Sequence, residues 1–104
     1  MKVTITYSDE SILSRIPKSE NITLLDVETL KGKKEAFKLK SHWGARLDPF
    51  IIIEDNGKAI KAFYTEAGDA VEDFLKYIQN EDISNRRYSW KNYLERYNKE
   101  RKSR

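Results

Sequence analysis

Residues 43–57 have the sequence WGARLDPFIIIEDNG, and this stretch decides the fold more than any other part of the chain. Its apolar run follows directly on a proline, which has no N–H to donate and is therefore placed at the start of a strand or on an edge strand. Asn56 and Gly57 end the run, and this pair suits a two-residue hairpin turn that needs two positive φ angles. The stretch therefore predicts strands over 49–55 and 58–64, paired as an antiparallel hairpin.

The residues at the N-terminus predict a strand followed by a helix. Residues 2–7 alternate between apolar and polar side chains and include β-branched and aromatic residues, a pattern typical of strands. A helix is expected over 8–16, capped by Ser8 or Asp9. Pro17 limits it, because the residue before a proline disfavours the α conformation. The side chains expected to point inward are Ile12, Leu13 and Ile16.

A second strand and a second helix are expected before the hairpin. Residues 21–29 form the strand, and their apolar centre suggests a strand that is covered on both faces. The helix is expected over 33–42 and is ended by Gly44. Its lysines are interpreted as a solvated face. Its apolar stripe consists of Ala36, Phe37, Leu39 and Trp43.

The region after the hairpin predicts two more helices. Residues 68–80 have apolar side chains at helical spacing, with Asp69 near the start as the helix dipole prefers. The resulting order is β-α-β-α-β-β-α, which predicts an α/β protein with a mixed four-stranded sheet, helices on both faces and an extra C-terminal helix. The two strand–helix–strand passages predict parallel strands. We expect a domain over 1–80 and a basic, aromatic-rich helical extension over 81–104.

Composition limits the function classes. The absence of cysteine excludes disulfides, thiolate metal sites and thiol catalysis, and a single histidine cannot form a histidine-based metal site. No apolar run approaches the roughly 18 residues that span a bilayer, and the N-terminus lacks a signal-peptide pattern. We therefore expect a soluble protein without cofactor or metal, located in the cytoplasm or, if viral, inside the particle or the host cytoplasm.

The 43–57 stretch resembles the segment of thioredoxin-like proteins in which an aromatic residue, Gly and Arg precede a cis-proline, a hydrophobic strand and an Asn-Gly hairpin. Residues 70–78 are similar to the last helix of that family, so the resemblance covers about residues 1–79. The N-terminus resembles the small glutaredoxin-like redoxins, with Ser11 and Ser14 where those proteins have Cys-x-x-Cys. Here both cysteines are absent, and 14–21 is shorter than the family's first helix. The residues that match the family segment are Trp43, Gly44, Arg46, Pro49, Ile51 to Ile53, Asn56 and Gly57.

The resemblance implies a cis bond before Pro49, whereas X-Pro statistics alone give cis in only ~5–6% of bonds. In the family, the loop at this proline exposes backbone groups that pair with an extended polypeptide. What the resemblance implies here is a shallow peptide-binding edge formed by Asp48, Pro49 and Phe50 together with the loop around Ser8 to Leu13. Ser11 and Ser14 are the serines expected to contribute to this contact surface.

Catalysis is not expected. A serine hydroxyl cannot perform thiol–disulfide exchange, and Ser11 as a nucleophile would need a base and an orienting group within reach. His42 and Asp48 are the only candidates, and nothing in the predicted fold directs His42 toward Ser11. We therefore interpret His42 as a surface histidine and Ser11 as a helix-terminal hydroxyl.

The C-terminal extension allows two interpretations. Residues 1–80 contain 12 Lys and Arg against 13 Asp and Glu, whereas residues 81–104 contain 8 against 4, so the basic charge lies in the extension. An aromatic stripe at helical spacing favours packing on the domain or on a protein partner, through Trp90, Tyr93, Leu94 and Tyr97. The alternative is nucleic-acid binding with an affinity that falls steeply with salt, through Arg86, Arg87, Lys91, Arg96, Lys99, Arg101 and Lys102.

Together these observations predict a redox-inactive, non-catalytic module for protein interaction or assembly, whose partner is another protein or a second copy of the chain. Nucleic-acid binding through the extension is the alternative, and no membrane partner is expected.

Overall fold

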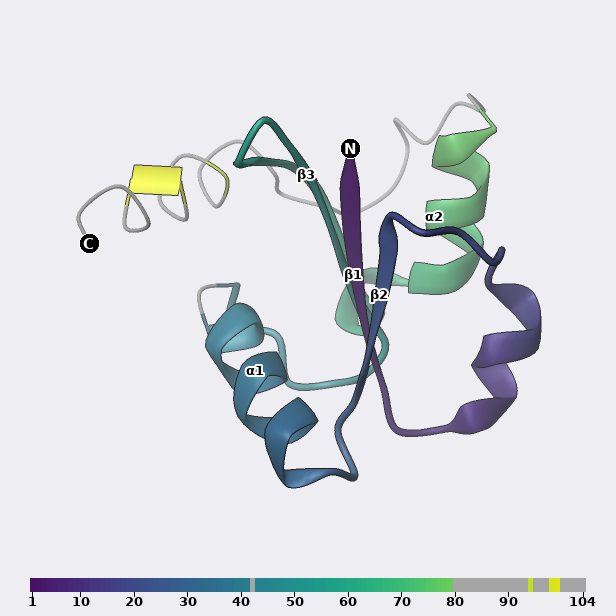
Figure 1. The fold of residues 1–104 in the computed structure, drawn as a ribbon, viewed down its shortest axis with the longest axis vertical. Coiled ribbons are helices and arrows are strands. Elements are labelled where there is room, and N and C mark those ends of the chain that lie inside the picture. Colours follow the sequence, from purple (N-terminus) through teal and green to yellow (C-terminus); the bar gives the residue numbers. More distant parts are fainter. Residues whose placement is uncertain (42, 80–93, 95–97, 100–104) are drawn as a thin grey trace.

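The computed structural model describes residues 1–41, 43–79, 94, 98 and 99. Its strands form one mixed sheet in the order β2-β1-β3-β4, in which β1 and β2 are parallel and the other neighbours are antiparallel. Helix α1 lies on one face of this sheet, and α2 with the 3-10 helix η1 lies on the other (Figure 1). The predicted α/β class, with a mixed four-stranded sheet and helices, is confirmed. The elements are β1 (Lys2–Tyr7), η1 (Glu10–Arg15), β2 (Ile22–Asp26), α1 (Leu30–Ser41), β3 (Phe50–Asp55), β4 (Lys58–Tyr64), the 3-10 turn η2 (Thr65–Ala67) and α2 (Ala70–Ile78).

Strand β3 supplies the centre of two hydrophobic cores. Ile51 and Ile53 face α2 and pack in a cluster with β1, β4 and Phe74. Phe50 and Ile52 face the opposite way and pack with Trp43 from the segment after α1. The side chains of Phe50, Ile51, Ile52 and Ile53 are all fully buried. A strand covered on both faces needs a continuous apolar run, which is why the sequence FIII occurs here.

The hairpin between β3 and β4 and the helix α2 are confirmed. Asn56 and Gly57 have φ angles of 52° and 78°, as a type I′ turn requires, and Asp55 pairs with Lys58 across it. The carboxylate of Asp69 accepts the N–H of Glu72 and so caps α2.

The expected direction of β3 is wrong, because β3 runs antiparallel to β1. The side chain of Asp48 is hydrogen-bonded to Thr6 near the carboxyl end of β1. Strand β3 therefore starts at this end of the sheet and runs back along β1, with Phe50 beside Thr6.

The second strand was expected over 21–29 and covered on both faces, and both expectations are wrong. Strand β2 spans only Ile22–Asp26 and lies at the edge of the sheet, where β1 is its single neighbour. Thr23 and Leu24 are exposed, with Leu24 at 43%. The two consecutive leucines indicate burial in the sequence, but an edge position determines how much of them is covered.

The first predicted helix is a 3-10 helix, η1, that ends at Arg15. Asp9 rather than Ser8 is its cap, because the Asp9 carboxylate accepts the N–H of Ser11. Ile16 is buried and Ile12 is half-buried against the core on this face, as expected.

Helix α1 begins three residues before its predicted start. The hydroxyl of Thr29 accepts the N–H of Gly32 at 3.0 Å, an N-terminal cap that the sequence analysis missed. At the other end Gly44 has a φ angle of +65° and donates to Ser41, while Ala45 donates to Lys40. This pair of bonds is a Schellman motif and confirms that Gly44 ends the helix.

One member of the predicted apolar stripe is not buried. Ala36 and Trp43 are buried, but the side chain of Phe37 is 71% exposed. The predicted C-terminal helix lies outside the described residues, apart from Leu94, Asn98 and Lys99.

Candidate functional site

A hollow of about 380 Å³ lies between α1 and the carboxyl ends of β1 and β2. In open α/β sheets the carboxyl ends of the strands are the usual place for ligands, because the loops that follow the strands diverge there. The hollow combines apolar, cationic and acidic groups. It is lined by Ser8, Val27, Glu28, Lys33, Ala36, Phe37, Lys40 and Asp48.

The start of α1 is held against the end of β2, and this contact positions one wall of the hollow. Asp26 accepts the N–H and the hydroxyl of Thr29 on its main-chain oxygen, at 3.1 and 2.8 Å. A Cβ added to Gly32 would lie 2.0 Å from that same oxygen, so only glycine allows this approach. The helix then presents Lys33 and Phe37, four residues apart, toward the hollow.

The opposite wall is fixed by a polar network around Asp48. Its carboxylate accepts from Lys40 Nζ at 2.9 Å and from the Thr6 hydroxyl at 2.6 Å. The side chains of Lys40 and Asp48 are each only 13% exposed. Removing one partner from such a pair would leave a mostly buried charge without compensation. The network therefore holds α1, β1 and the loop before β3 in one arrangement.

The main chain of the Asp48–Phe50 loop is also held from behind. The Pro49 carbonyl accepts from the Thr65 hydroxyl at 2.8 Å, and the Phe50 N–H donates to the Thr6 hydroxyl at 3.0 Å. By contrast, the N–H and C=O of Asp48 have no hydrogen-bond partner in the part of the chain that the structure describes. The peptide bond between Asp48 and Pro49 is cis, as the resemblance implied.

The residues before this loop are clamped by Glu66 of η2. Its carboxylate accepts the N–H groups of Arg46 and Leu47 at 2.6 and 3.1 Å. Partial burial raises the pKa of Glu66, but these two hydrogen bonds and the nearby Lys40 outweigh it, so the pKa lies below its ordinary value. The carboxylate is therefore ionised at neutral pH and stabilises the loop in this form.

The structure brings only part of the predicted peptide-binding edge together. Asp48 lines the hollow and Pro49 is half-buried beside it, whereas Phe50 is fully buried. The side chain of Phe50 therefore supports the loop from the core and offers no side-chain contact surface.

The serines of the predicted motif do not line this hollow. Ser11 and Ser14 are exposed and are bonded to each other, because the Ser14 hydroxyl donates to the Ser11 carbonyl at 3.0 Å. Ser8, the first residue of the predicted loop Ser8 to Leu13, lines the hollow together with Asp48. His42 lies outside the described residues.

Two described residues of the C-terminal extension contact the domain. Leu94 is half-buried against the core cluster that contains Trp43 and Phe50. The Asn98 carboxamide pairs with the backbone of Ala59 in β4, accepting its N–H at 2.9 Å and donating to its C=O at 3.2 Å. Lys99 is exposed. The other predicted residues lie outside the described part of the chain: Arg86, Arg87, Trp90, Lys91, Tyr93, Arg96, Tyr97, Arg101 and Lys102.

Several residues that form this site were not predicted from the sequence. Lys33 and Phe37 were assigned to a solvated face and an apolar stripe, respectively. The overlap of the two patterns on one helix was the available signal, because an apolar residue between lysines at helical spacing indicates an amphipathic surface. No sequence signal pointed to Asn98.

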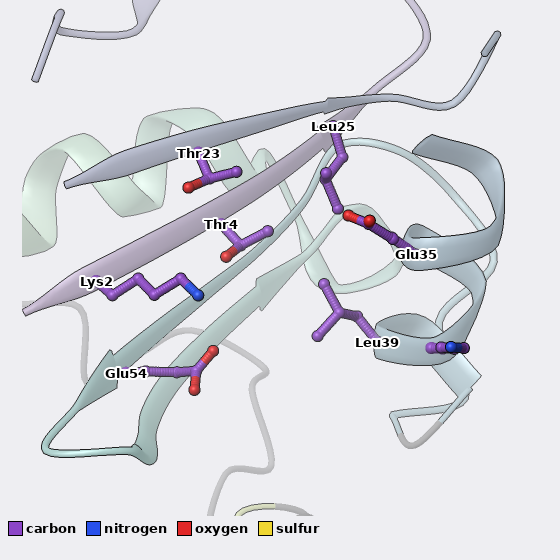
Figure 2. A pocket seen from close by; sticks show the side chains of 8 residues that line it. Lys2, Thr4, Thr23, Leu25, Glu35, Leu39 and Glu54 are labelled. Atoms are coloured by element: carbon purple, nitrogen blue, oxygen red, sulfur yellow. The ribbon is translucent and has the colours of Figure 1, made fainter. Parts of the chain in front are cut away.

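A second hollow, of about 290 Å³, lies on the α1 side of the sheet. Thr23 and Leu25 point into it from β2, Thr4 from β1, and Leu39 from α1 (Figure 2). Glu35, Lys38, Lys2 and Glu54 complete its lining. It contains charges of both signs.

Within the described residues, no three His, Cys, Asp or Glu side chains are arranged to hold a metal ion. No helix in the same residues is long and apolar enough to cross a bilayer. Comparison of the chain with protein-family models, curated proteins and solved structures found no match.

Proposed function

We propose that this protein is a non-catalytic, thioredoxin-like module for protein interaction or assembly, and that it binds an extended polypeptide at the hollow beside Asp48. The strand order β2-β1-β3-β4, with helices on both faces, supports the thioredoxin-like assignment. The absence of cysteine supports binding without thiol exchange, because that exchange requires a thiolate.

The proposal rests on the main-chain N–H and C=O groups of Asp48. Its N–H and C=O are without partners in the described residues, while the Pro49 carbonyl and the Phe50 N–H on the following residues are both bonded internally. An extended polypeptide gains affinity from backbone hydrogen bonds of this kind and gains specificity from pockets for its side chains. Asp48 is therefore the backbone contact, and the hollow is the side-chain pocket.

The lining of the hollow indicates which side chain it accepts. Val27, Ala36 and the exposed ring of Phe37 give it apolar walls. Burying an aliphatic or aromatic side chain there stabilises the complex by about 25 cal/mol for each Å² of apolar surface removed from water. The preferred ligand is thus an extended segment with one large apolar residue.

Selection of a random peptide library on the full-length protein tests the proposal. We expect selected peptides to share a large apolar residue, and to shift the backbone amide resonances of Asp48 and Ser8 in NMR titrations. Phe37→Ala should weaken their binding roughly tenfold, as expected when a partly exposed aromatic contact is truncated.

Leu30→Ala is the matched control, because Leu30 belongs to the same helix and is 72% exposed but does not line the hollow. Its peptide affinity should equal that of the unmodified protein. Equal loss in both variants, or peptides that leave the Asp48 resonance unmoved, would refute the proposal.

A further inference from the structure

The outer side of β2 is an open sheet edge, and the register shows which backbone groups it presents. Val3 N–H donates to the Asn21 carbonyl at 2.8 Å, and Val27 N–H donates to the Tyr7 carbonyl at 3.0 Å. Since main-chain groups alternate in direction along a strand, the residues at 23 and 25 face β1. Ile22, Leu24 and Asp26 therefore direct their N–H and C=O groups away from the sheet.

Two of these six outward groups are satisfied within the chain. The Ile22 N–H donates to the Ser19 carbonyl at 3.2 Å, and the Asp26 carbonyl accepts both bonds from Thr29. The remaining groups are the N–H and C=O of Leu24, the C=O of Ile22 and the N–H of Asp26. None of the four has a partner in the described part of the chain.

We propose that this edge binds a second copy of the chain, with β2 pairing antiparallel to its copy about a two-fold axis at Leu24. In this register Leu24 faces Leu24 of the other copy, and Ile22 faces Asp26. The two leucines exchange both of their backbone bonds. Each Asp26 N–H donates to the opposite Ile22 carbonyl, which gives four hydrogen bonds across the axis.

The pairing leaves no backbone group unmatched, and this identifies the occupant. The two groups already satisfied internally, the Ile22 N–H and the Asp26 carbonyl, would have faced each other across the axis. A strand of unrelated sequence would present a free N–H opposite the Asp26 carbonyl and a free C=O opposite the Ile22 N–H, and neither would find a partner. In a second copy both of these groups are already bonded within their own chain, so every free donor along one edge faces a free acceptor of the other.

The side chains of β2 are consistent with this pairing. Leu24 is 43% exposed and would be covered by its own copy. Thr23 and Leu25 point to the opposite face (Figure 2) and would form cross-strand pairs with Leu25 and Thr23 of the copy. The strand contains neither Lys nor Pro, two residues that natural edge strands use to prevent pairing, and its one charged residue is Asp26 at its end.

The inference goes beyond the proposed function, and neither depends on the other. Peptide binding uses the Asp48 main chain and the hollow, whereas the dimer uses the outer side of β2. A peptide that binds a strictly monomeric protein would refute only the dimer, and a dimer that binds no peptide would refute only the proposed function.

Light scattering and sedimentation equilibrium of the full-length protein over a wide concentration range test the dimer. The mass should rise from the monomer to the dimer value. Leu24→Lys places two ammonium groups opposite each other and should raise the dimer dissociation constant roughly tenfold or more. Ile78→Lys is the matched control, because Ile78 in α2 is 42% exposed, and it should leave the mass curve unchanged.

Cross-linking gives a second test that does not depend on the lysine variant folding. The chain has no cysteine, so Leu24→Cys introduces a single thiol. At the two-fold axis the two Cα atoms lie about 5.5 Å apart, within disulfide range. Thr23→Cys, on the same exposed strand, places the two thiols beyond that range. Mild oxidation should therefore cross-link the first variant and not the second.

A monomer mass at every concentration would overturn the proposal. So would a Leu24→Lys variant that associates as strongly as the unmodified protein, or a Thr23→Cys variant that cross-links as readily as Leu24→Cys.

Discussion

The two edge strands of the sheet, β2 and β4, differ in whether their outward backbone groups have hydrogen-bond partners. On β4, the carboxamide of Asn98 pairs with both the N–H and the C=O of Ala59, as a neighbouring strand would. On β2, the N–H and C=O of Leu24 have no such partner in the described residues. A single side chain from a distant part of the sequence is thus sufficient to close one point of a sheet edge. Where no such side chain is present, the edge stays available for pairing.

The ends of the two edges differ as well. The carboxyl end of β2 is fixed by local contacts, through Asp26, Thr29 and Gly32. The start of β4 is fixed by Asn98, which is 39 residues away in the sequence. Substitutions at the two edges should therefore lower the free energy of unfolding by different amounts and affect different parts of the sheet.

The largest expected effect is at the β2 end. Gly32→Ala forces a Cβ against the Asp26 carbonyl, so the start of α1 or the end of β2 must move. We expect the free energy of unfolding to fall by about 3 kcal/mol, at the upper end of overpacking effects. Urea denaturation measures it, with the exposed Lys34→Ala as the control for a neutral change on α1. If the free energy of unfolding falls no more in Gly32→Ala than in Lys34→Ala, the close approach is not maintained in solution.

Leu94→Ala should have the next largest effect. Leu94 is half-buried against the core on the α1 face, so truncation removes packing without creating a fully enclosed cavity. We expect a loss of about 1.5 kcal/mol in the free energy of unfolding, below the range for fully buried leucines. Chemical denaturation of the full-length protein checks the value, and an unchanged midpoint would contradict the contact.

Asn98→Ala tests the comparison of the two edges directly. It removes both hydrogen bonds to Ala59, which is buried, and should reduce the free energy of unfolding by about 1 kcal/mol. Amide hydrogen exchange gives the sharper measurement: Ala59 should lose its protection in the variant while Leu24 exchanges as before. If Leu24 also changes, the two edges are coupled and the comparison fails.

The smallest effect concerns pH and should involve neither edge. The pKa of Glu66 lies below its ordinary value of 4.5, so its carboxylate stabilises the folded state above that pH. This contribution is lost as the pH falls through the folded-state pKa. Because Glu66 is only partly buried, we expect less than about 1 kcal/mol.

Glu66→Gln should flatten the acid limb of the stability curve below pH 4.5, measured by urea denaturation at several pH values. Glu20→Gln, at an exposed position, controls for the loss of one negative charge. An acid limb that is unchanged in Glu66→Gln would contradict the role of this clamp.

Local signals in the sequence predicted the elements that depend on local physics. The Asn-Gly turn needs two positive φ angles, and α2 shows apolar residues at helical spacing after a capping aspartate, so both were predicted correctly. The class of the sheet followed from the order of these elements.

The errors concern features that depend on distant residues. The two leucines of β2 look like buried residues, but an edge position is a property of the whole sheet. The start of α1 depends on the approach of Gly32 to the Asp26 carbonyl. Asp48 was predicted as a site residue, but its partners Thr6 and Lys40 were not, because those contacts exist only after three elements have come together.

The hydroxyl of Thr6 donates to Asp48 and accepts from the Phe50 N–H, so one oxygen atom bonds both the side chain of Asp48 and the main chain of Phe50. Valine has nearly the same shape, yet it would leave the buried Phe50 N–H without its acceptor and leave Asp48 with Lys40 as its remaining side-chain donor, whereas serine would keep both bonds. Over evolutionary time this position should drift between the two hydroxyl residues and rarely beyond them. Distant relatives of the chain should then be recognisable by a Ser or Thr near the end of the first strand, followed about 42 residues later by Asp-Pro, even where overall identity has disappeared.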